Sequence, residues 1–317
     1  MSGPNRIAVQ RRESMYEPMT VRRFRRKFRT EQDCLKYLIK RKWPDGFCCP
    51  RCGNDRAYLI ESHQLYQCTR CRHQTSVTAH TIFHKTRKPL KDWFWAIFLI
   101  ATRTTGSSAR QLQHDLGLSY PTAWTWCHKI GKAMQERDTR YSLRGIIEID
   151  DSYFGGKRKP GKRGRGAGGK VPVMVAVESG QKGAGHVGLS KVESLRSEQV
   201  KIFLQEKVHK ASTLRSDGYV IYGPLSQSFH LTQMPVLGTR AAELFPQVHR
   251  VIGRVKTWLR GTHFHVSEKH LNRYLAEFSY RFNRRFEQRR ATIFDRLVTA
   301  CCRTQTITYQ HLVADLN

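Results

Sequence analysis

Ile146-Ile147-Glu148-Ile149-Asp150 is the stretch that decides the fold, because it is a run of β-branched residues that ends in an acid. Two further runs are typical of strands, VPVMVAVE at Val171–Glu178 and STLRS at Ser212–Ser216. Between these two, Ser197–His209 carries apolar residues at helical spacing on one face. Short β-rich runs that alternate with helical patterns from Gly145 onward predict an α/β unit.

A carboxylate ends two of these predicted strands. Asp150 closes the first run, and Asp217 directly follows the third. Carboxylates at the ends of neighbouring strands can share divalent cations, and oxygen ligands suit Mg²⁺ or Mn²⁺. A pair of such metals can clamp the attacking and leaving oxygens of a phosphodiester displacement. Isolated strand-end aspartates are usually turn formers, so spacing alone leaves this alternative open.

Paired cysteines mark residues 31–88 as a metal-binding block. Cys49-Pro-Arg-Cys52 and Cys68-Thr-Arg-Cys71 are two C-x-x-C pairs with fifteen residues between them. Each pair supplies two thiolates from one tight turn, and four thiolates close a tetrahedral site, so we predict a zinc ribbon. The alternative is a set of unrelated buried thiols. The other cysteines lack such partners, and we expect them outside the site: Cys34, Cys48, Cys127, Cys301 and Cys302.

Residues 89–140 carry helical patterns. We predict a helix from Pro89 to about Thr102, followed by a helix–turn–helix of Ser108–Leu116, a turn at Gly117, and a second helix from Pro121 to about Met134. An ordinary helical hairpin is the alternative, since such patterns recur by chance. In the helix–turn–helix interpretation, four side chains face a DNA major groove: Tyr120, Thr122, Thr125 and Lys129.

The 317 residues carry 56 Lys and Arg against 25 Asp and Glu, a formal charge of +31. Such an excess favours a polyanionic partner, and nucleic acid comes ahead of an anionic membrane surface. Basic residues are dense in residues 1–30, which we expect to form a nearly structureless arm. They are dense again in the Gly-rich tract Gly155–Lys170, where we expect DNA contacts from Lys157, Arg158, Lys159, Lys162, Arg163 and Arg165.

Composition also excludes some classes of protein. Hydrophobic residues make up 39% of the chain, which excludes wholesale disorder. No stretch reaches the roughly 20 apolar residues that span a bilayer. Met1–Arg29 lacks the apolar segment of a secretory signal, so we expect an intracellular protein without a membrane partner. Cysteine pairs in a reducing compartment favour metal over disulfides.

A last helical pattern covers Leu271–Arg285. Its apolar residues recur at helical spacing and define one face. Arg281, Arg284 and Arg285 line the remainder. In so basic a chain we expect these arginines to contact DNA phosphates, and a solvated charged face is the alternative.

Five stretches of the chain belong together: WPDGFCCPRCG at Trp43–Gly53, YQCTRCRHQTS at Tyr66–Ser76, IEIDDSYFGGK at Ile147–Lys157, SDG at Ser216–Gly218 and the basic stretch Val248–Arg285. In this order they resemble a bacterial insertion-sequence transposase with an N-terminal zinc ribbon and a DDE-type catalytic domain. The resemblance implies a multidomain α/β protein, in which an RNase H-like mixed sheet flanked by helices follows the ribbon and a helix–turn–helix.

The resemblance also implies an activity. Such an enzyme binds the terminal inverted repeats of its element, cuts DNA strands with water in a metal-dependent step, and joins the freed 3′-hydroxyl to target DNA. The implied cofactors are structural Zn²⁺ and catalytic Mg²⁺ or Mn²⁺. The implied partner is double-stranded DNA, on which a homo-oligomer assembles, and the implied location is the bacterial cytoplasm, on the nucleoid.

Catalytic roles carry over position by position. Asp150 matches the first catalytic acid of the family and Asp217 the second. The third position lies seven residues before a lysine, here Lys256, and it holds His249 in place of the usual acid, which implies a DDH-like site. Imidazole suits Mn²⁺ better than Mg²⁺. Glu243, six residues upstream, is a rival third ligand with better chemistry and a poorer position.

The expected organisation is a basic arm at 1–30, a zinc ribbon at 31–88, a DNA-binding helix–turn–helix region at 89–140, an RNase H-like catalytic domain at 145–300 and a tail at 301–317. A catalytically inactive, domesticated zinc-ribbon regulator that binds DNA is the alternative function, suggested by His249 in place of an acid. A nuclease that acts on RNA–DNA hybrids is a third, and the predicted sequence-reading modules argue against it.

Overall fold

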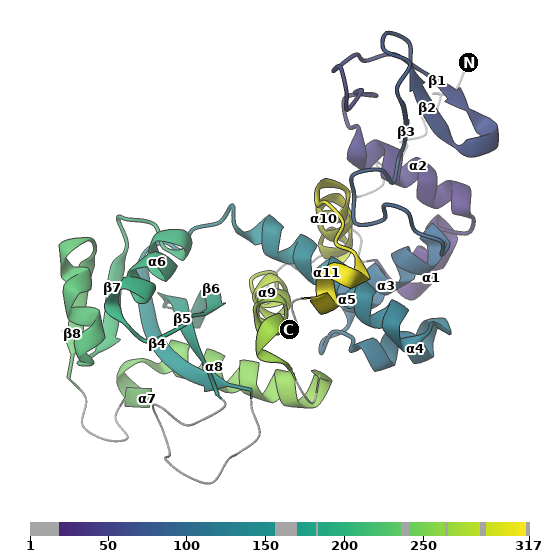
Figure 1. The fold of residues 1–317 in the computed structure, drawn as a ribbon. Coiled ribbons are helices and arrows are strands. Elements are labelled where there is room, and N and C mark those ends of the chain that lie inside the picture. Colours follow the sequence, from purple (N-terminus) through teal and green to yellow (C-terminus); the bar gives the residue numbers. More distant parts are fainter. Residues whose placement is uncertain are drawn as a thin grey trace, which may run out of the picture.

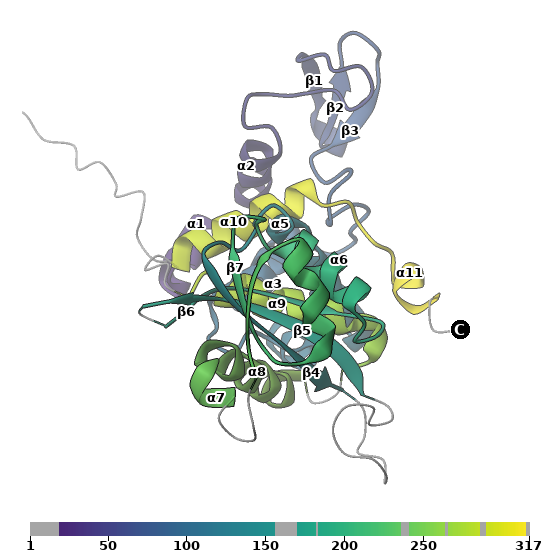
Figure 2. The ribbon, with the colours of Figure 1, turned by 90° about the vertical axis from the view of Figure 1, so that its left-hand side faces the viewer.

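The computed structural model describes residues 19–155, 170–181, 183–235, 241–263, 266–285 and 290–314. Figure 1 shows a five-stranded sheet with its helices, a group of helices beside it and a small three-stranded sheet farther out. Figure 2 shows the small sheet standing clear of the rest. The side chains predicted to bind DNA in the basic tract lie outside the described residues: Lys157, Arg158, Lys159, Lys162, Arg163 and Arg165.

The large sheet contains β4 (Ile146–Phe154), β5 (Val171–Gly180), β6 (Gly183–Lys191), β7 (Thr213–Asp217) and β8 (His230–Met234). Their order is β6-β5-β4-β7-β8. β4 runs antiparallel to β5 and β5 to β6, whereas β7 is parallel to β4 and β8 to β7. This mixed order is the RNase H-like arrangement, so the predicted fold class is confirmed.

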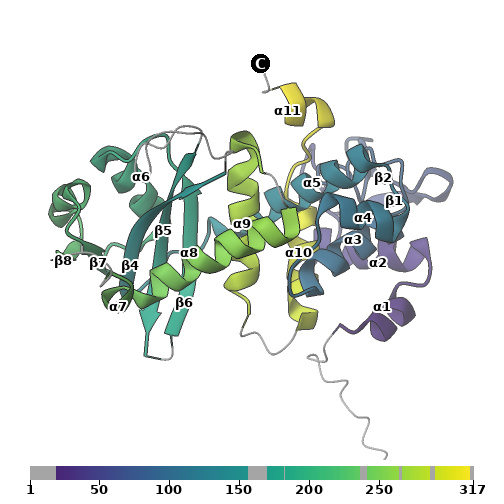
Figure 3. The same ribbon diagram turned by 90° about the horizontal axis from the view of Figure 1, so that it is seen from below.

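Helices cover both faces of this sheet, because its central strands are apolar on both sides. Val173, Val175 and Val177 of β5 share a core with α8 (Pro246–Trp258) and α9 (Leu271–Phe282). The alternate residues pack with α6 (Ser197–Lys207) on the opposite face. Figure 3 shows α8 lying across β4 and β5. The sheet and α8 together form the frame that positions the candidate site.

The helical group has one shared apolar core. It contains the predicted helices, found as α3 (Leu90–Thr102), α4 (Ala109–Leu116) and α5 (Tyr120–Asp138). Gly117 joins α4 to α5 with a φ of 59°, a left-handed conformation that glycine adopts without strain. None of the helices within the described residues combines the length and apolar character needed to cross a membrane.

The expectation of a structureless N-terminal arm is wrong for residues 19–30. These residues form α1 (Val21–Lys27) and lead into α2 (Glu31–Lys42). Phe24 and Phe28 lie four positions apart, so their rings share one face. Both rings are fully buried in the helical core, with centroids 5.1 Å apart. The basic side chains between them obscured this short amphipathic helix.

The C-terminal helix α10 (Arg290–Arg303) belongs to the helical core rather than to the sheet. Phe294, Leu297 and Cys301 are buried there beside α2, α3 and α5. A short helix α11 (Tyr309–Ala314) follows it. We therefore propose that the catalytic unit ends near Arg285 and that the chain then returns to the helical group.

The two larger parts are in contact along α5 and α9, and they also meet at the loop Arg103–Gly106 between α3 and α4. The chain after α8 continues as a π-helical turn, Leu259–His263. Trp258 Nε1 and Thr262 Oγ1 both donate to the carbonyl of Thr105, at 2.7 and 3.1 Å. The helical group is thus fastened directly to the helix that carries His249.

The small sheet consists of β1 (Ala57–Ile60), β2 (Leu65–Cys68) and β3 (Gln74–Ser76), paired antiparallel in that order. Gly53 and Arg72 each follow a C-x-x-C pair and have φ of 72° and 59°. Their backbone N–H groups donate to the carbonyls of Cys49 and Cys68, at 2.9 and 3.1 Å. These two turns aim both cysteine pairs at one point.

Candidate active site

Asp150 and Asp217 lie on neighbouring parallel strands and on the same face of the sheet. β4 and β7 pair at Ile147 with Leu214 and at Glu148 with Arg215. Both aspartates lie two residues beyond the last pair, and alternation along a strand places them on the face of Glu148. This is the face that α8 covers. The register therefore places both predicted acids on one face of the sheet. Asp217 ends β7 as expected, whereas Asp150 lies in the middle of β4, which continues to Phe154 instead of ending at Asp150.

His249 reaches the same place from α8. Its Nδ1 lies 3.8 Å from Oδ2 of Asp150, and the two side chains are 34% and 20% exposed. Ligands of one octahedral metal at about 2.1 Å lie about 3 Å apart when adjacent and about 4.2 Å apart when opposite. The separation of the two atoms lies between these two values, so a small shift of either side chain would let both bind one Mg²⁺ or Mn²⁺, and both remain open to solvent.

Lys256 follows His249 by two helical turns, which places both on one face of α8. Its ammonium lies 5.5 Å from the ring centroid of Phe154 at the end of β4. Burial lowers the pKa of Lys256, Lys170 lowers it further, and Asp150 opposes the shift. The lysine thus lies within electrostatic reach of the first aspartate.

The rival ligand Glu243 lies on the short helix α7 (Ala241–Leu244), and its side chain is exposed. Within the described ranges, only the four paired cysteines bring three or more metal-type ligand atoms within 4.8 Å of one another. Neither His249 nor Glu243 completes so tight a set with Asp150 and Asp217. The choice between these two residues therefore remains a proposal, for which the contact of His249 with Asp150 is the structural support.

Glu148 is a residue whose role the sequence analysis missed. It is 2% exposed and lies two positions before Asp150 on β4. Its Oε2 accepts the backbone N–H groups of Gln247 and Val248 at the start of α8, at 2.8 and 2.9 Å. The hydroxyl of Ser179 donates to Oε1 at 2.8 Å. The sequence feature that could have indicated a buried role is the position of this acid inside the otherwise apolar run Ile146–Ile149.

The cysteine site has the geometry of tetrahedral zinc. The four Sγ atoms of Cys49, Cys52, Cys68 and Cys71 lie within 4.8 Å of one another, with contacts of 3.6 Å for two pairs. Zinc–sulfur bonds of about 2.3 Å place tetrahedral sulfurs about 3.8 Å apart. Burial would raise the pKa of Cys68, but the N–H groups of Cys71 and Arg70 lower it to about 6, which favours a thiolate.

Cys68→Ser is expected to lose bound zinc and to unfold β1–β3, because structural zinc contributes folding free energy directly, about 10–16 kcal/mol in small zinc peptides. Cys48→Ser is the matched control, since the exposed Cys48 lies outside the cluster. Elemental analysis of both purified variants measures the metal, and circular dichroism measures the fold. Full zinc occupancy in Cys68→Ser would contradict the assignment.

Comparison with known proteins supports this division. The ISXO2-like transposase domain matches residues 142–283. The transposase zinc-ribbon domain matches residues 29–74. The chain therefore carries a transposase zinc ribbon followed by an ISXO2-like transposase domain. A related protein, an uncharacterized protein in transposable element ISH50 of the archaeon Halobacterium salinarum, is 25% identical over 276 residues, which cover 80% of this chain and 91% of that protein. This relative comes from an archaeon, whereas the motifs suggested a bacterial element.

Two solved structures match the chain at low similarity. The catalytic core domain of BIV integrase is 14% identical, with a TM-score of 0.28, over 43% of this chain and 83% of that one. The Mos1 transposase paired-end complex is 13% identical, with a TM-score of 0.27, over 63% and 78%. At these TM-scores the fold assignment of the transposase rests on its own strand order.

The four predicted groove-facing residues of the transposase have different surroundings. Tyr120 is 44% exposed, with the Arg110 guanidinium 5.6 Å from its ring centroid. Thr122 Oγ1 lies 2.9 Å from Ser119 Oγ, and Thr125 donates to the carbonyl of Pro121 at 2.7 Å. Lys129 instead turns toward the helical core, where its ammonium lies 5.9 Å from the Trp93 ring centroid. Of these four side chains, Tyr120 in the first turn of α5 is exposed, and the other three are partly buried.

Arg281, Arg284 and Arg285 are held by the protein itself. Arg281 donates to the carbonyls of Arg103 and Thr104 in the loop described above. Arg284 makes two contacts with the carboxylate of Asp138, at 2.7 and 3.2 Å. Because these guanidinium groups have protein partners, we leave the three arginines out of the proposed DNA surface. The phosphate contacts were predicted because these arginines lie beside the apolar face of a helical pattern. The same pattern also occurs in helices whose arginines bind neighbouring parts of the protein.

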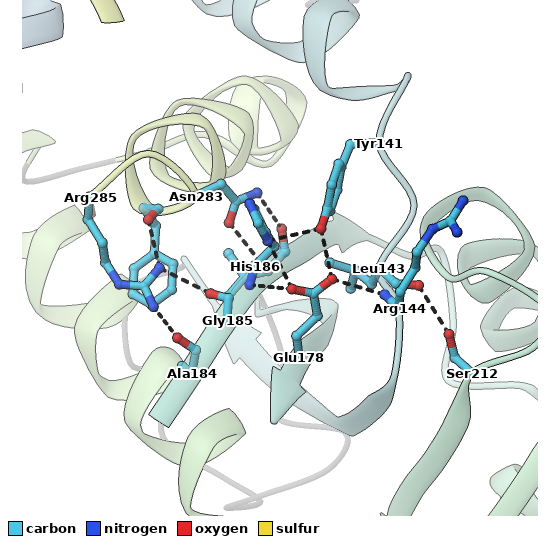
Figure 4. A network of polar contacts seen from close by, with 12 residues as sticks. Tyr141, Leu143, Arg144, Glu178, Ala184, Gly185, His186, Ser212, Asn283 and Arg285 are labelled. Atoms are coloured by element: carbon cyan, nitrogen blue, oxygen red, sulfur yellow. Dashed lines mark hydrogen bonds and ion pairs between the residues drawn. The ribbon is translucent and has the colours of Figure 1, made fainter. Parts of the chain in front are cut away.

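Figure 4 shows how β5 and β6 fasten the linker between α5 and β4. The hydroxyl of Tyr141 and the backbone N–H of Arg144 donate to Glu178 Oε1, each at 2.9 Å. The backbone N–H and Nδ1 of His186 contact Oε2, also at 2.9 Å. Burial would raise the pKa of Glu178, but hydrogen bonds from His186, Arg144 and Tyr141 lower it to about 2.

The same figure shows side chains of the segment after α9 satisfying the edge strand β6. Asn283 accepts the N–H of Val187 at 2.7 Å and donates to its carbonyl at 3.0 Å. Arg285 donates to the carbonyls of Gly185, at 3.0 Å, and of Ala184. A covered edge cannot pair with another strand. Arg285 therefore supplies hydrogen-bond donors to carbonyl groups at the edge of the sheet.

Proposed function

We propose that the chain binds the terminal inverted repeats of an insertion sequence, cleaves DNA strands at those ends and joins the freed 3′-hydroxyl to target DNA. The observation that carries this proposal is the placement of Asp150 and Asp217 on one face of neighbouring parallel strands, with His249 Nδ1 of α8 3.8 Å from Asp150 Oδ2. The match to an ISXO2-like transposase domain supports the reaction class. The site is open to solvent, as a duplex substrate requires.

Asp150, Asp217 and His249 would hold the catalytic Mg²⁺ or Mn²⁺, which when bound stabilises charge on the attacking and leaving oxygens. Asp150, on the strand between β5 and β7, would hold metal together with His249 of α8. Lys256 offers a cation on the same face of α8 for a phosphate of the DNA strand. The zinc ribbon and the first turn of α5, with Tyr120 and Thr122, would read the ends.

Joining two ends requires that both be held together, so we propose a homo-oligomer assembled on double-stranded DNA. We place this complex in the cytoplasm, on the nucleoid. The domesticated regulator remains the second candidate, because His249 stands where the family usually has an acid. A labelled duplex that carries one flanking inverted repeat tests the proposal. With Mg²⁺ or Mn²⁺, a cut at the repeat boundary supports the transposase, and tight binding without a cut supports the regulator.

DNA affinity is expected to depend strongly on salt, because bound Lys and Arg release condensed counterions. Each phosphate contact contributes about −0.9 to the slope of log K against log salt. Deletion of residues 156–169, most of the basic tract, should flatten this slope by several such steps and leave the preferred end sequence unchanged. Fluorescence anisotropy over a salt series measures the slope. An unchanged slope would assign the tract no part in DNA binding.

A further inference from the structure

Glu148 links the strand that carries Asp150 to the helix that carries His249. It is almost fully buried, and its side chain projects from β4 toward the first turn of α8. One carboxylate oxygen accepts two backbone N–H groups of α8, and the other accepts the hydroxyl of Ser179 on β5. The carboxylate therefore connects two strands and one helix at the edge of the candidate site.

The helix needs this partner because it has no side-chain cap of its own. α8 begins after Phe245, whose side chain makes no capping hydrogen bond. The free N–H groups at a helix start carry partial positive charge and require acceptors. Glu148 supplies both an acceptor and a negative charge, from a strand 99 positions earlier than Gln247.

His249 is the residue directly after the two that Glu148 binds. Asp150 lies two residues after Glu148 on the same face of β4. Glu148 therefore links the two residues whose atoms Nδ1 of His249 and Oδ2 of Asp150 lie 3.8 Å apart: it is on the same strand as Asp150, and its carboxylate binds the backbone of α8 directly before His249. Any shift of the helix start changes this separation directly.

We propose that Glu148 is a positioning residue that holds His249 at metal-sharing distance from Asp150. This inference rests on the proposed function. Partners that orient metal ligands typically contribute about 10–100-fold to metal affinity or activity. Glu148→Ala removes both the acceptor and the charge, so the upper part of that range is expected. Glu148→Gln keeps one oxygen for α8 and loses the charge, so the lower part is expected.

A double-mutant cycle separates positioning from simple stabilisation. The full chain, bound to its end duplex, is titrated with Mn²⁺, and electron paramagnetic resonance measures free Mn²⁺. Glu148→Ala should raise the Mn²⁺ dissociation constant in the wild-type background by about 10–100-fold. In the His249→Ala background the same change should have no further effect. Cleavage rates at equal DNA occupancy provide the second measurement.

Glu178→Gln is the matched control, because Glu178 is a second carboxylate with several hydrogen bonds but ties the linker instead of α8. Its Mn²⁺ affinity should equal that of the wild type. If Glu148→Ala does not fold, the cycle with Glu148→Gln decides. Equal losses in both backgrounds, or no loss at all, would overturn the positioning role. If the wild-type protein fails to cut the DNA with every metal tested, the proposed function itself would be wrong.

Discussion

Asp150→Asn is expected to reduce strand cleavage by at least about 10³-fold while end binding survives. Asparagine keeps the size of the side chain but removes the charge that attracts a metal ion. A metal-clamped displacement relies on several kcal/mol of charge stabilisation, and about 4 kcal/mol corresponds to a factor of about 10³ in rate. Asp217→Asn should behave in the same way, because Asp217 occupies the neighbouring strand end.

The neighbouring Asp151 provides a control on the same strand. Alternation turns its side chain to the other face, where the hydroxyl of Tyr222 lies 3.5 Å from Oδ1. Asp151→Asn should therefore cleave at close to the wild-type rate. Quantitative gels at equal DNA occupancy compare the three variants. Cleavage by Asp150→Asn at the rate of Asp151→Asn would remove Asp150 from the catalytic site.

His249→Ala is expected to come close to abolishing strand transfer, because it removes the ligand that α8 contributes beside Asp150. His249→Glu should retain activity and shift the preference from Mn²⁺ toward Mg²⁺, since a hard oxygen replaces a borderline nitrogen. Glu243→Gln tests the exposed rival residue on α7 and should stay active. All three are assayed with each metal at equal DNA occupancy. A dead Glu243→Gln beside an active His249→Ala would reverse the assignment.

The sequence predicted the parts of the structure that depend on local patterns. The apolar runs predicted β5 to within two residues of its end, and the cysteine spacing predicted the cluster of four Sγ atoms. The run at Ile146 predicted the start of β4 but not its end, because β4 continues past Asp150 to Phe154. Parallel pairing of β4 with β7 places Asp150 and Asp217 on one face. The third residue, His249, was implied by the family resemblance, and its Nδ1 lies 3.8 Å from Asp150 Oδ2.

The features that the sequence did not reveal depend on distant partners. Glu148 acts through backbone groups of α8, which no pattern around residue 148 can indicate. Arg281 and Arg284 looked like phosphate ligands, yet their acceptors belong to the loop after α3 and the end of α5. The return of α10 to the helical core likewise required knowledge of which apolar faces meet in space.

The most direct test of the account is a strand-joining assay with the wild-type protein. A duplex that ends in the inverted repeat with an exposed 3′-hydroxyl is incubated with plasmid target and Mn²⁺ or Mg²⁺. Asp150→Asn, confirmed as folded and zinc-loaded, provides the inactive reference. The account predicts covalent joining of the 3′-hydroxyl to the plasmid by the wild type and none by the variant. Wild-type protein that binds the end tightly and forms no joined product with either metal would contradict it.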